Sequence, residues 1–60
     1  MLKIGDKVKW NDPAINDYPI EDREDALNRI FNIISINGDI ILISDGETEV
    51  EVFEEELTKI

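Results

Sequence analysis

The sequence predicts a mainly β domain: a five-stranded small barrel with a long first loop that contains a short helix, and with a helical turn before the last strand. Two observations predict this all-β fold class. Isoleucine, which packs well on a pleated sheet and loses side-chain freedom in a helix, makes up 11 of the 60 residues. Two turn signals, Asn37-Gly38 and Asp45-Gly46, separate apolar runs of strand length. A chain this short forms one domain, residues 1–60.

The first predicted strand covers residues 7–10, where lysines alternate with apolar side chains. Strict alternation is typical of a half-buried strand, so Val8 and Trp10 should face inward. The strand should end at residues 11–13, because proline cannot donate to a β-ladder and the preceding Asn and Asp favour turns.

The stretch NDPAINDYPIEDRED, residues 11–25, occupies the place of the long first loop. From Pro19 onward the pattern fits a short helix with three apolar residues near one side, namely Ile20, Leu27 and Ile30 or Phe31. Asp25 and Arg29 would then pair at i,i+4, which stabilises a helix by about 0.2–0.5 kcal/mol. We interpret the spaced apolar residues of the loop as a lid over the sheet: Ile15, Tyr18 and Ile20.

Three strands joined by tight turns follow the loop, at residues 29–36, Ile40–Ile43 and Thr48–Phe53. Glu54–Leu57 breaks the alternation with good helix formers and is long enough for one helical turn. A short terminal strand, Thr58–Ile60, completes the count of five.

Tight turns fix the register of the central strands. A two-residue loop at Asn37-Gly38 places two opposed pairs on each face, Ser35 with Ile40 and Ile33 with Leu42 on one, Ile34 with Ile41 and Asn32 with Ile43 on the other. The next loop sets Val50 beside Ile41 if it has two residues, and beside Leu42 if it has three. Both faces therefore carry isoleucine, and the sequence leaves open which one is the core.

Whichever face takes Val50 and Val52 becomes the core that Val8 and Trp10 share, and the other face keeps a surplus of isoleucine. Leaving this second face exposed to water would cost several kcal/mol of burial free energy in a protein whose stability is about 5 kcal/mol. The lid and a second copy of the chain are the two candidate covers, so we expect a homodimer. The candidate protein interface is Tyr18, Ile33, Ile34, Ile40, Ile41, Leu42 and Ile43.

The order of elements resembles the Src-homology-3-like small β-barrel superfamily along the whole chain. Its peptide-binding members carry an Ala-Leu-Tyr-Asp-Tyr signature before the long loop, a tryptophan pair opening the middle strand, and a proline-tyrosine element at the helical turn. Residues 7–10, 40–42 and 54–57 hold none of these motifs. The resemblance therefore implies the fold and does not imply recognition of proline-rich peptides.

A Gly-Asp-x-Val-x-Trp opening (Gly5, Asp6, Val8, Trp10) and an Asp-Gly turn before an acidic strand are further features. In these the chain resembles small uncharacterised barrel proteins of Bacteroides-type bacteria, a resemblance that implies no function.

The composition excludes several classes of function. The chain has no cysteine and no histidine, which removes disulfides, the usual zinc ligands, a cysteine nucleophile and the usual near-neutral general base. We therefore expect no enzyme and no cofactor. The net charge of -9 should repel nucleic-acid backbones. Lys3 and Gly5 interrupt the apolar opening, so we expect no signal peptide, no membrane partner and a cytoplasmic location.

The leading hypothesis is a non-catalytic protein-binding or assembly module that forms a homodimer through its surplus isoleucine face, against the alternative that these residues are ordinary core. The second is an acidic mimic of nucleic acid that binds a basic nucleic-acid-handling protein. Alternate strand residues lie about 6.5–7 Å apart, close to the phosphate spacing of one DNA strand. Its candidate face is Glu47, Glu49, Glu51, Glu54 and Glu55, which a solvated acidic surface also explains.

Two further alternatives involve the loop. A divalent-cation site would use its acids, Asp12, Asp17, Glu21, Asp22 and Asp25, but the loop lacks the glycine and the spacing of a calcium loop. Tyr18 and Trp10 with nearby acids would suit an aromatic cage for a cation, against the simpler interpretation that Trp10 is core and Tyr18 packs in the loop.

Overall fold

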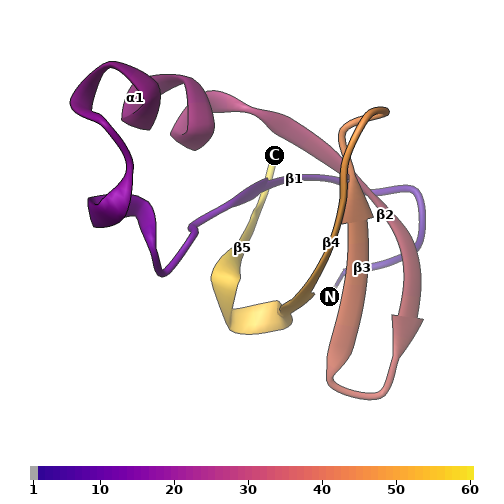
Figure 1. The fold of residues 1–60 in the computed structure, drawn as a ribbon. Helices are drawn as coiled ribbons and strands as arrows, with labels where there is room; N and C mark the ends of the chain where they lie inside the picture. The colour runs from indigo at the N-terminus through magenta and orange to yellow at the C-terminus, as the bar shows by residue number, and fades with distance from the viewer. Residues whose placement is uncertain (1) are drawn as a thin grey trace.

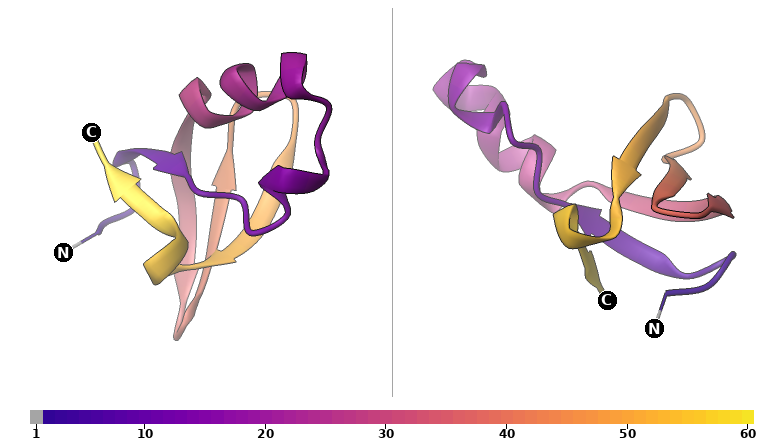
Figure 2. Two further views of the ribbon diagram at one scale, coloured as in Figure 1. Left: turned by 90° about the vertical axis from the view of Figure 1, so that its left-hand side faces the viewer. Right: turned by 90° about the horizontal axis from the view of Figure 1, so that it is seen from below.

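The computed structural model describes residues 2–60 and consists of five antiparallel strands in one sheet with one α-helix (Figures 1 and 2). The prediction of a mainly β fold is confirmed. The strands are β1 (Lys7–Trp10), β2 (Ile30–Asn37), β3 (Ile40–Ser44), β4 (Glu49–Phe53) and β5 (Leu57–Lys59). Their order across the sheet is β4-β3-β2-β1-β5, and the sheet is not closed into a barrel, because β4 and β5 at its two ends do not pair.

Two of the three helical elements of residues 2–60 lie where the sequence predicts them. Helix α1 (Ile20–Asn28) begins directly after Pro19, and the short 3-10 helix η1 (Ile15–Asp17), which the sequence did not predict, precedes it. A second 3-10 helix, η2 (Glu54–Glu56), separates β4 from β5. It is held by the Glu56 carboxylate, which accepts a hydrogen bond from the Phe53 backbone N–H at 2.7 Å.

The register predicted for the β2–β3 hairpin is wrong by one residue at the turn. Asn37 pairs with Ile40, so the two-residue loop is Gly38-Asp39. The physical reason is the backbone: a loop on Asn37-Gly38 favours positive φ at both residues, whereas only Gly38 has it, at 62°. The turn therefore places the glycine first.

A β-bulge then shifts the same hairpin again. The register changes between Ile33 and Ser35, so that Ile33 pairs with Ile43 while Ser35 pairs with Leu42. Ile34 is the extra residue, and such an insertion bends a strand and increases its twist. The predicted opposition of Ile34 to Ile41 is also wrong, because the displaced turn pairs Ile41 with Ile36. The bulge in turn pairs Ile33 with Ile43 and not with the predicted Leu42.

The loop after β3 is longer than predicted. Ser44 pairs with Glu49, which leaves four residues, 45–48, in the connection. The Asp45 carboxylate organises it by accepting hydrogen bonds from the Glu47 and Thr48 N–H groups at 2.9 and 2.8 Å. Loops of two and of four residues place the same residues of β4 on the same face of the sheet. Val50 and Val52 therefore lie on the face of Ile41 and Ile43.

The core forms on this inner face of the sheet. Six residues from four strands are buried there, with Val8 and Ile43 fully inaccessible: Val8, Phe31, Ile33, Ile41, Ile43 and Val52. Trp10 packs against the cluster, and its ring meets that of Phe31 edge to face with centroids 6.2 Å apart. The prediction that Val8 and Trp10 face inward is confirmed.

The first loop does not act as the predicted lid over the surplus isoleucine. Helix α1 contacts β1 and η1, at the opposite end of the molecule from the tip of the β2–β3 hairpin (Figures 1 and 2). Ile20 is 77% exposed and Leu27 43% exposed. The loop and α1 instead lie beside Trp10 and Phe31, where their half-buried side chains are Asp12, Tyr18 and Ala26.

Candidate functional site

The structure divides the predicted interface residues between two faces of the sheet. Ile33, Ile41 and Ile43 are buried in the core, so they are not available to a partner. Their neighbours along the strands, Ile34, Ile40 and Leu42, point to the outer face. Tyr18 lies apart from both sets, half-buried in the first loop.

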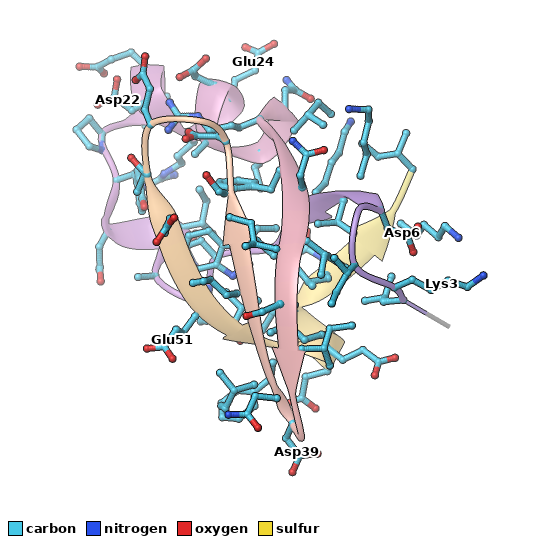
Figure 3. All side chains as sticks on the ribbon, turned by 90° about the vertical axis from the view of Figure 1, so that its right-hand side faces the viewer. Lys3, Asp6, Asp22, Glu24, Asp39 and Glu51 are labelled. Carbon is cyan, nitrogen blue, oxygen red and sulfur yellow. The ribbon has the colours of Figure 1, made fainter. Side chains whose placement is uncertain are left out.

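An apolar patch occupies this outer face, and we call it the outer patch: Ile34, Ile40, Leu42 and Phe53. Ile40 lies directly opposite Phe53 on the neighbouring strand, and Ile34 and Phe53 are 42% and 49% exposed. Figure 3 looks onto β2, β3 and β4, with α1 beyond one end of the strands and not in front of them. Sequence reasoning missed Phe53, although it shares the alternation of Glu49 and Glu51 and so had to lie on their face.

The predicted acidic face is spread over three places. Glu47 lies in the β3–β4 loop, Glu49 and Glu51 point outward from β4, and Glu54 and Glu55 lie on η2. All five are exposed, and Glu51 projects from β4 into solvent (Figure 3). Two neighbouring acids are already engaged within the chain, Asp45 by its loop and Glu56 by the start of η2.

An open groove of about 1000 Å³ lies at the end of the core between the β2–β3 hairpin and η2. Its apolar lining consists of Leu2, Ile36, Ile41 and Phe53, and its charged lining consists of Asp39, Glu54 and Glu55. Asp39 marks one side, at the tip of the hairpin (Figure 3). Sequence reasoning did not find this groove, because its residues come from segments that only the fold brings together.

A smaller hollow of about 260 Å³ lies beside α1, and both aromatic residues of the aromatic-cage hypothesis, Trp10 and Tyr18, line it. The rest of its lining is Asp12, Asp22, Asp25, Ala26, Arg29 and Phe31. It already holds a cation, since Arg29 lines it and pairs with Asp25 at 3.2 Å. The Trp10 Nε1 atom is buried and has no hydrogen-bond partner among residues 2–60.

Tyr18 is tied to the same loop. Its hydroxyl donates a 2.6 Å hydrogen bond to Asp12 Oδ2. The pKa of Tyr18 is raised above its usual 10.0, mainly by this hydrogen bond to the carboxylate and to a smaller extent by desolvation. The tyrosine therefore holds the loop together and stands apart from the outer patch with which the sequence grouped it.

Two kinds of site are not found in the part of the chain that the structure describes. In residues 2–60 no three or more Asp and Glu side chains gather closely enough to hold a metal ion. Within the same residues, no helix has the length and apolar character that crossing a membrane requires.

Fold and site together define a small, mainly β domain with an apolar patch on the outside of an open sheet and an acid-rimmed groove at the end of its core. The sequence matches no protein-family model, and no curated protein or solved structure is significantly similar to it. The function has to be argued from these surfaces.

Proposed function

We propose that this chain is a cytoplasmic, non-catalytic protein-binding or assembly module that forms a homodimer through the outer patch. The observation that carries the proposal is the patch itself, four large apolar side chains on adjacent strands that neither the loop nor α1 covers, of which Ile34 and Phe53 are exposed and Ile40 and Leu42 are half-buried. Burying apolar surface gains about 25 cal/mol per Å². Contiguous exposed patches of this kind typically mark interaction surfaces.

Charges along one edge of the patch support a second copy as the occupant. One row of cross-strand neighbours runs Lys7, Asn32, Ser44 and Glu49, with a cation at one end and an acid at the other. The Lys7 ammonium leans over β2, where its Nζ donates to Asn32 Oδ1 at 3.3 Å. A two-fold axis parallel to the strands would set Lys7 of each copy against Glu49 of the other.

The Src-homology-3-like barrel remains our proposal for the fold family. Support comes from the long loop after β1, the consecutive pairing of β2, β3 and β4, and the single helical turn before β5. Small β domains of this size commonly act as adaptors, and function must still be argued from the site. The scaffold presents the outer patch on paired strands, which suits a rigid interface.

The oligomeric state in solution tests the proposed function. Sedimentation and light scattering at micromolar concentration should give a dimer for the natural chain and a monomer for Leu42→Lys. Ile20→Lys is the matched control, because Ile20 is 77% exposed on α1 and remote from the patch. A monomer for the natural chain would rule out the homodimer.

A charge exchange tests the orientation of the copies. Lys7→Glu and Glu49→Lys should each weaken the dimer by like-charge repulsion, and the two variants mixed together should associate again as a heterodimer. If mixing restores nothing, the axis proposed here is wrong.

The second candidate, an acidic mimic of nucleic acid, has support from Glu49 and Glu51, which alternate on the exposed face of β4. The other acids of the candidate face lie elsewhere, Glu47 in the β3–β4 loop and Glu54 and Glu55 on η2. Because the acids do not form one continuous face, we favour the protein-binding module. Binding to basic nucleic-acid proteins that weakens with salt and is lost in Glu49→Gln/Glu51→Gln would favour the mimic instead.

A further inference from the structure

The groove between the β2–β3 hairpin and η2 is a surface separate from the outer patch, with which it shares only Phe53. It opens onto the inner side of the sheet, where Ile36 and Ile41 are direct cross-strand partners. The turn at Gly38-Asp39 borders it on one side, and the start of η2 borders it on the other. Rigid strand ends and a helical turn thus frame it.

The walls and floor of the groove are apolar and accessible. Ile36 is 40% exposed and Phe53 is 49% exposed, which are high values for large apolar residues lining a hollow. The floor reaches Ile41, a core residue that is only 3% exposed. An apolar side chain placed here would be desolvated on several sides and would contact the core itself.

The rim carries one sign of charge only. Asp39, Glu54 and Glu55 line the groove, and no lysine or arginine of residues 2–60 does. Among residues 2–60, no hydrogen bond or ion pair engages these three carboxylates, whereas Asp25 and Asp45 near the smaller hollow are both neutralised by Arg29. The groove therefore attracts cations, and residues 2–60 place none at its rim.

We propose that this groove binds a segment of a partner protein in which an apolar side chain is flanked by lysine or arginine. The apolar side chain would pack on Ile36, Ile41 and Phe53, and the flanking cations would meet the rim carboxylates. A volume of about 1000 Å³ exceeds what one side chain fills, so an extended segment suits it better than a small ion. This inference rests on the proposed protein-binding role and is independent of self-association.

A labelled hexapeptide, Lys-Arg-Leu-Leu-Arg-Lys, is a direct probe of the groove in a fluorescence anisotropy titration. We expect saturable binding that weakens between about 0.1 M and 1 M salt, where the screening length falls from about 10 Å to about 3 Å. The peptide with serine in place of both leucines should bind much more weakly. The absence of saturable binding, or equal binding of the two peptides, would overturn the proposal.

Two triple variants with the same net charge separate the groove from the general acidity of the chain. Asp39→Asn/Glu54→Gln/Glu55→Gln removes the rim charges and should weaken binding about ten-fold. The control, Asp17→Asn/Glu21→Gln/Glu24→Gln, removes three exposed charges from η1 and α1, away from both the groove and the outer patch, and should change affinity less than about two-fold. Equal weakening by both variants would mean nonspecific attraction and would refute the groove as the site.

Two additional measurements keep this inference distinguishable from the homodimer. The titration repeated with Leu42→Lys should give unchanged peptide affinity, because Leu42 lies outside the groove. Amide NMR shifts on adding peptide should concentrate at Ile36, Gly38 and Phe53. Shifts confined to Ile34 and Leu42, or loss of binding in Leu42→Lys, would place the peptide on the outer patch and overturn the assignment to the groove.

Discussion

The guanidinium of Arg29 contacts the carboxylate of Asp45 across 16 positions of sequence, with Nη1 3.2 Å from Oδ2. The same guanidinium pairs through Nη2 with Asp25 on α1, as the i,i+4 spacing predicts. Arg29 thereby joins the end of the helix, the start of β2 and the β3–β4 loop. The Asp45 side chain in this ion pair is half-buried, with 12% of its surface exposed.

Asp45 should matter more for its loop hydrogen bonds than for its charge. Asp45→Asn keeps an oxygen that can accept from the Glu47 and Thr48 N–H groups and loses the ion pair with Arg29. Asp45→Ala loses all three contacts. We expect the melting temperature to fall slightly for Asp45→Asn and clearly more for Asp45→Ala. Equal melting temperatures for the two variants would contradict the role of the loop hydrogen bonds.

The contribution of Asp45 should also depend on pH. Hydrogen bonds from the Glu47 and Thr48 backbone, with Arg29 nearby, lower the pKa of Asp45 below its usual 3.8. A lowered pKa means that the stabilisation is fully present above about pH 3.8 and is lost as the pH falls through the folded-state pKa. The difference in stability between the natural chain and Asp45→Asn, measured by urea unfolding, should shrink below that pH. If the difference in stability between the two chains grew on acidification, this pH dependence would be contradicted.

Tyr18 provides a titration that one absorbance signal reports, since it is the only tyrosine. Its pKa is raised by the hydrogen bond to Asp12, so its contribution to stability is present below the usual 10.0 and lost as the pH rises through the folded-state pKa. Ultraviolet titration should give a midpoint above 10.0, and Asp12→Asn should bring it back toward that value. A natural midpoint at or below 10.0 would argue against the Tyr18–Asp12 bond in solution.

Neighbouring residues on β3 should respond in opposite ways to truncation. Ile43 is fully buried, so Ile43→Ala should cost about 2–5 kcal/mol and leave a chain of this size close to unfolding. Leu42 lies on the outer face, and Leu42→Ala should cost less than about 1 kcal/mol in the monomer. Urea unfolding at low protein concentration measures both free energies without a contribution from self-association. The reverse ranking would mean that the faces are misassigned.

Trp10 should tolerate loss of its indole nitrogen. Trp10 Nε1 is a buried donor without a partner among residues 2–60, and such a group costs about 1–3 kcal/mol. Trp10→Phe removes this cost while keeping an aromatic ring against Phe31, so the free energy of unfolding should change by less than about 1 kcal/mol. A much larger loss would indicate that a bound group satisfies Nε1 in solution.

The sequence alone determined the five strands, the α-helix and the helical turn before the last strand, together with their order and their approximate bounds. The alternation at residues 7–10, the proline before α1 and the two glycine turns act through backbone preferences over a few residues. For that reason the first strand was predicted with its observed bounds and the helix with its observed start. The outer position of Ile40 and Leu42 was one of two alternatives that the sequence left open. Both alternatives placed Ile33 on their face and Ile34 on the other, which the bulge at Ile34 reverses.

Tertiary structure decided the faces, the place of the loop and the groove. The loop at Gly38 is displaced by one residue, which changes the cross-strand pairs but keeps their faces. The extra residue at the Ile34 bulge moves Ile33 from the face of Leu42 to the face of Ile43, and this bulge depends on how β2 bends against its partners. The loop lies beside Trp10, and the long-range contact of Arg29 with Asp45 ties the end of α1 to the β3–β4 loop. The groove joins the hairpin, η2 and Leu2, segments far apart in sequence, so no local pattern encodes it.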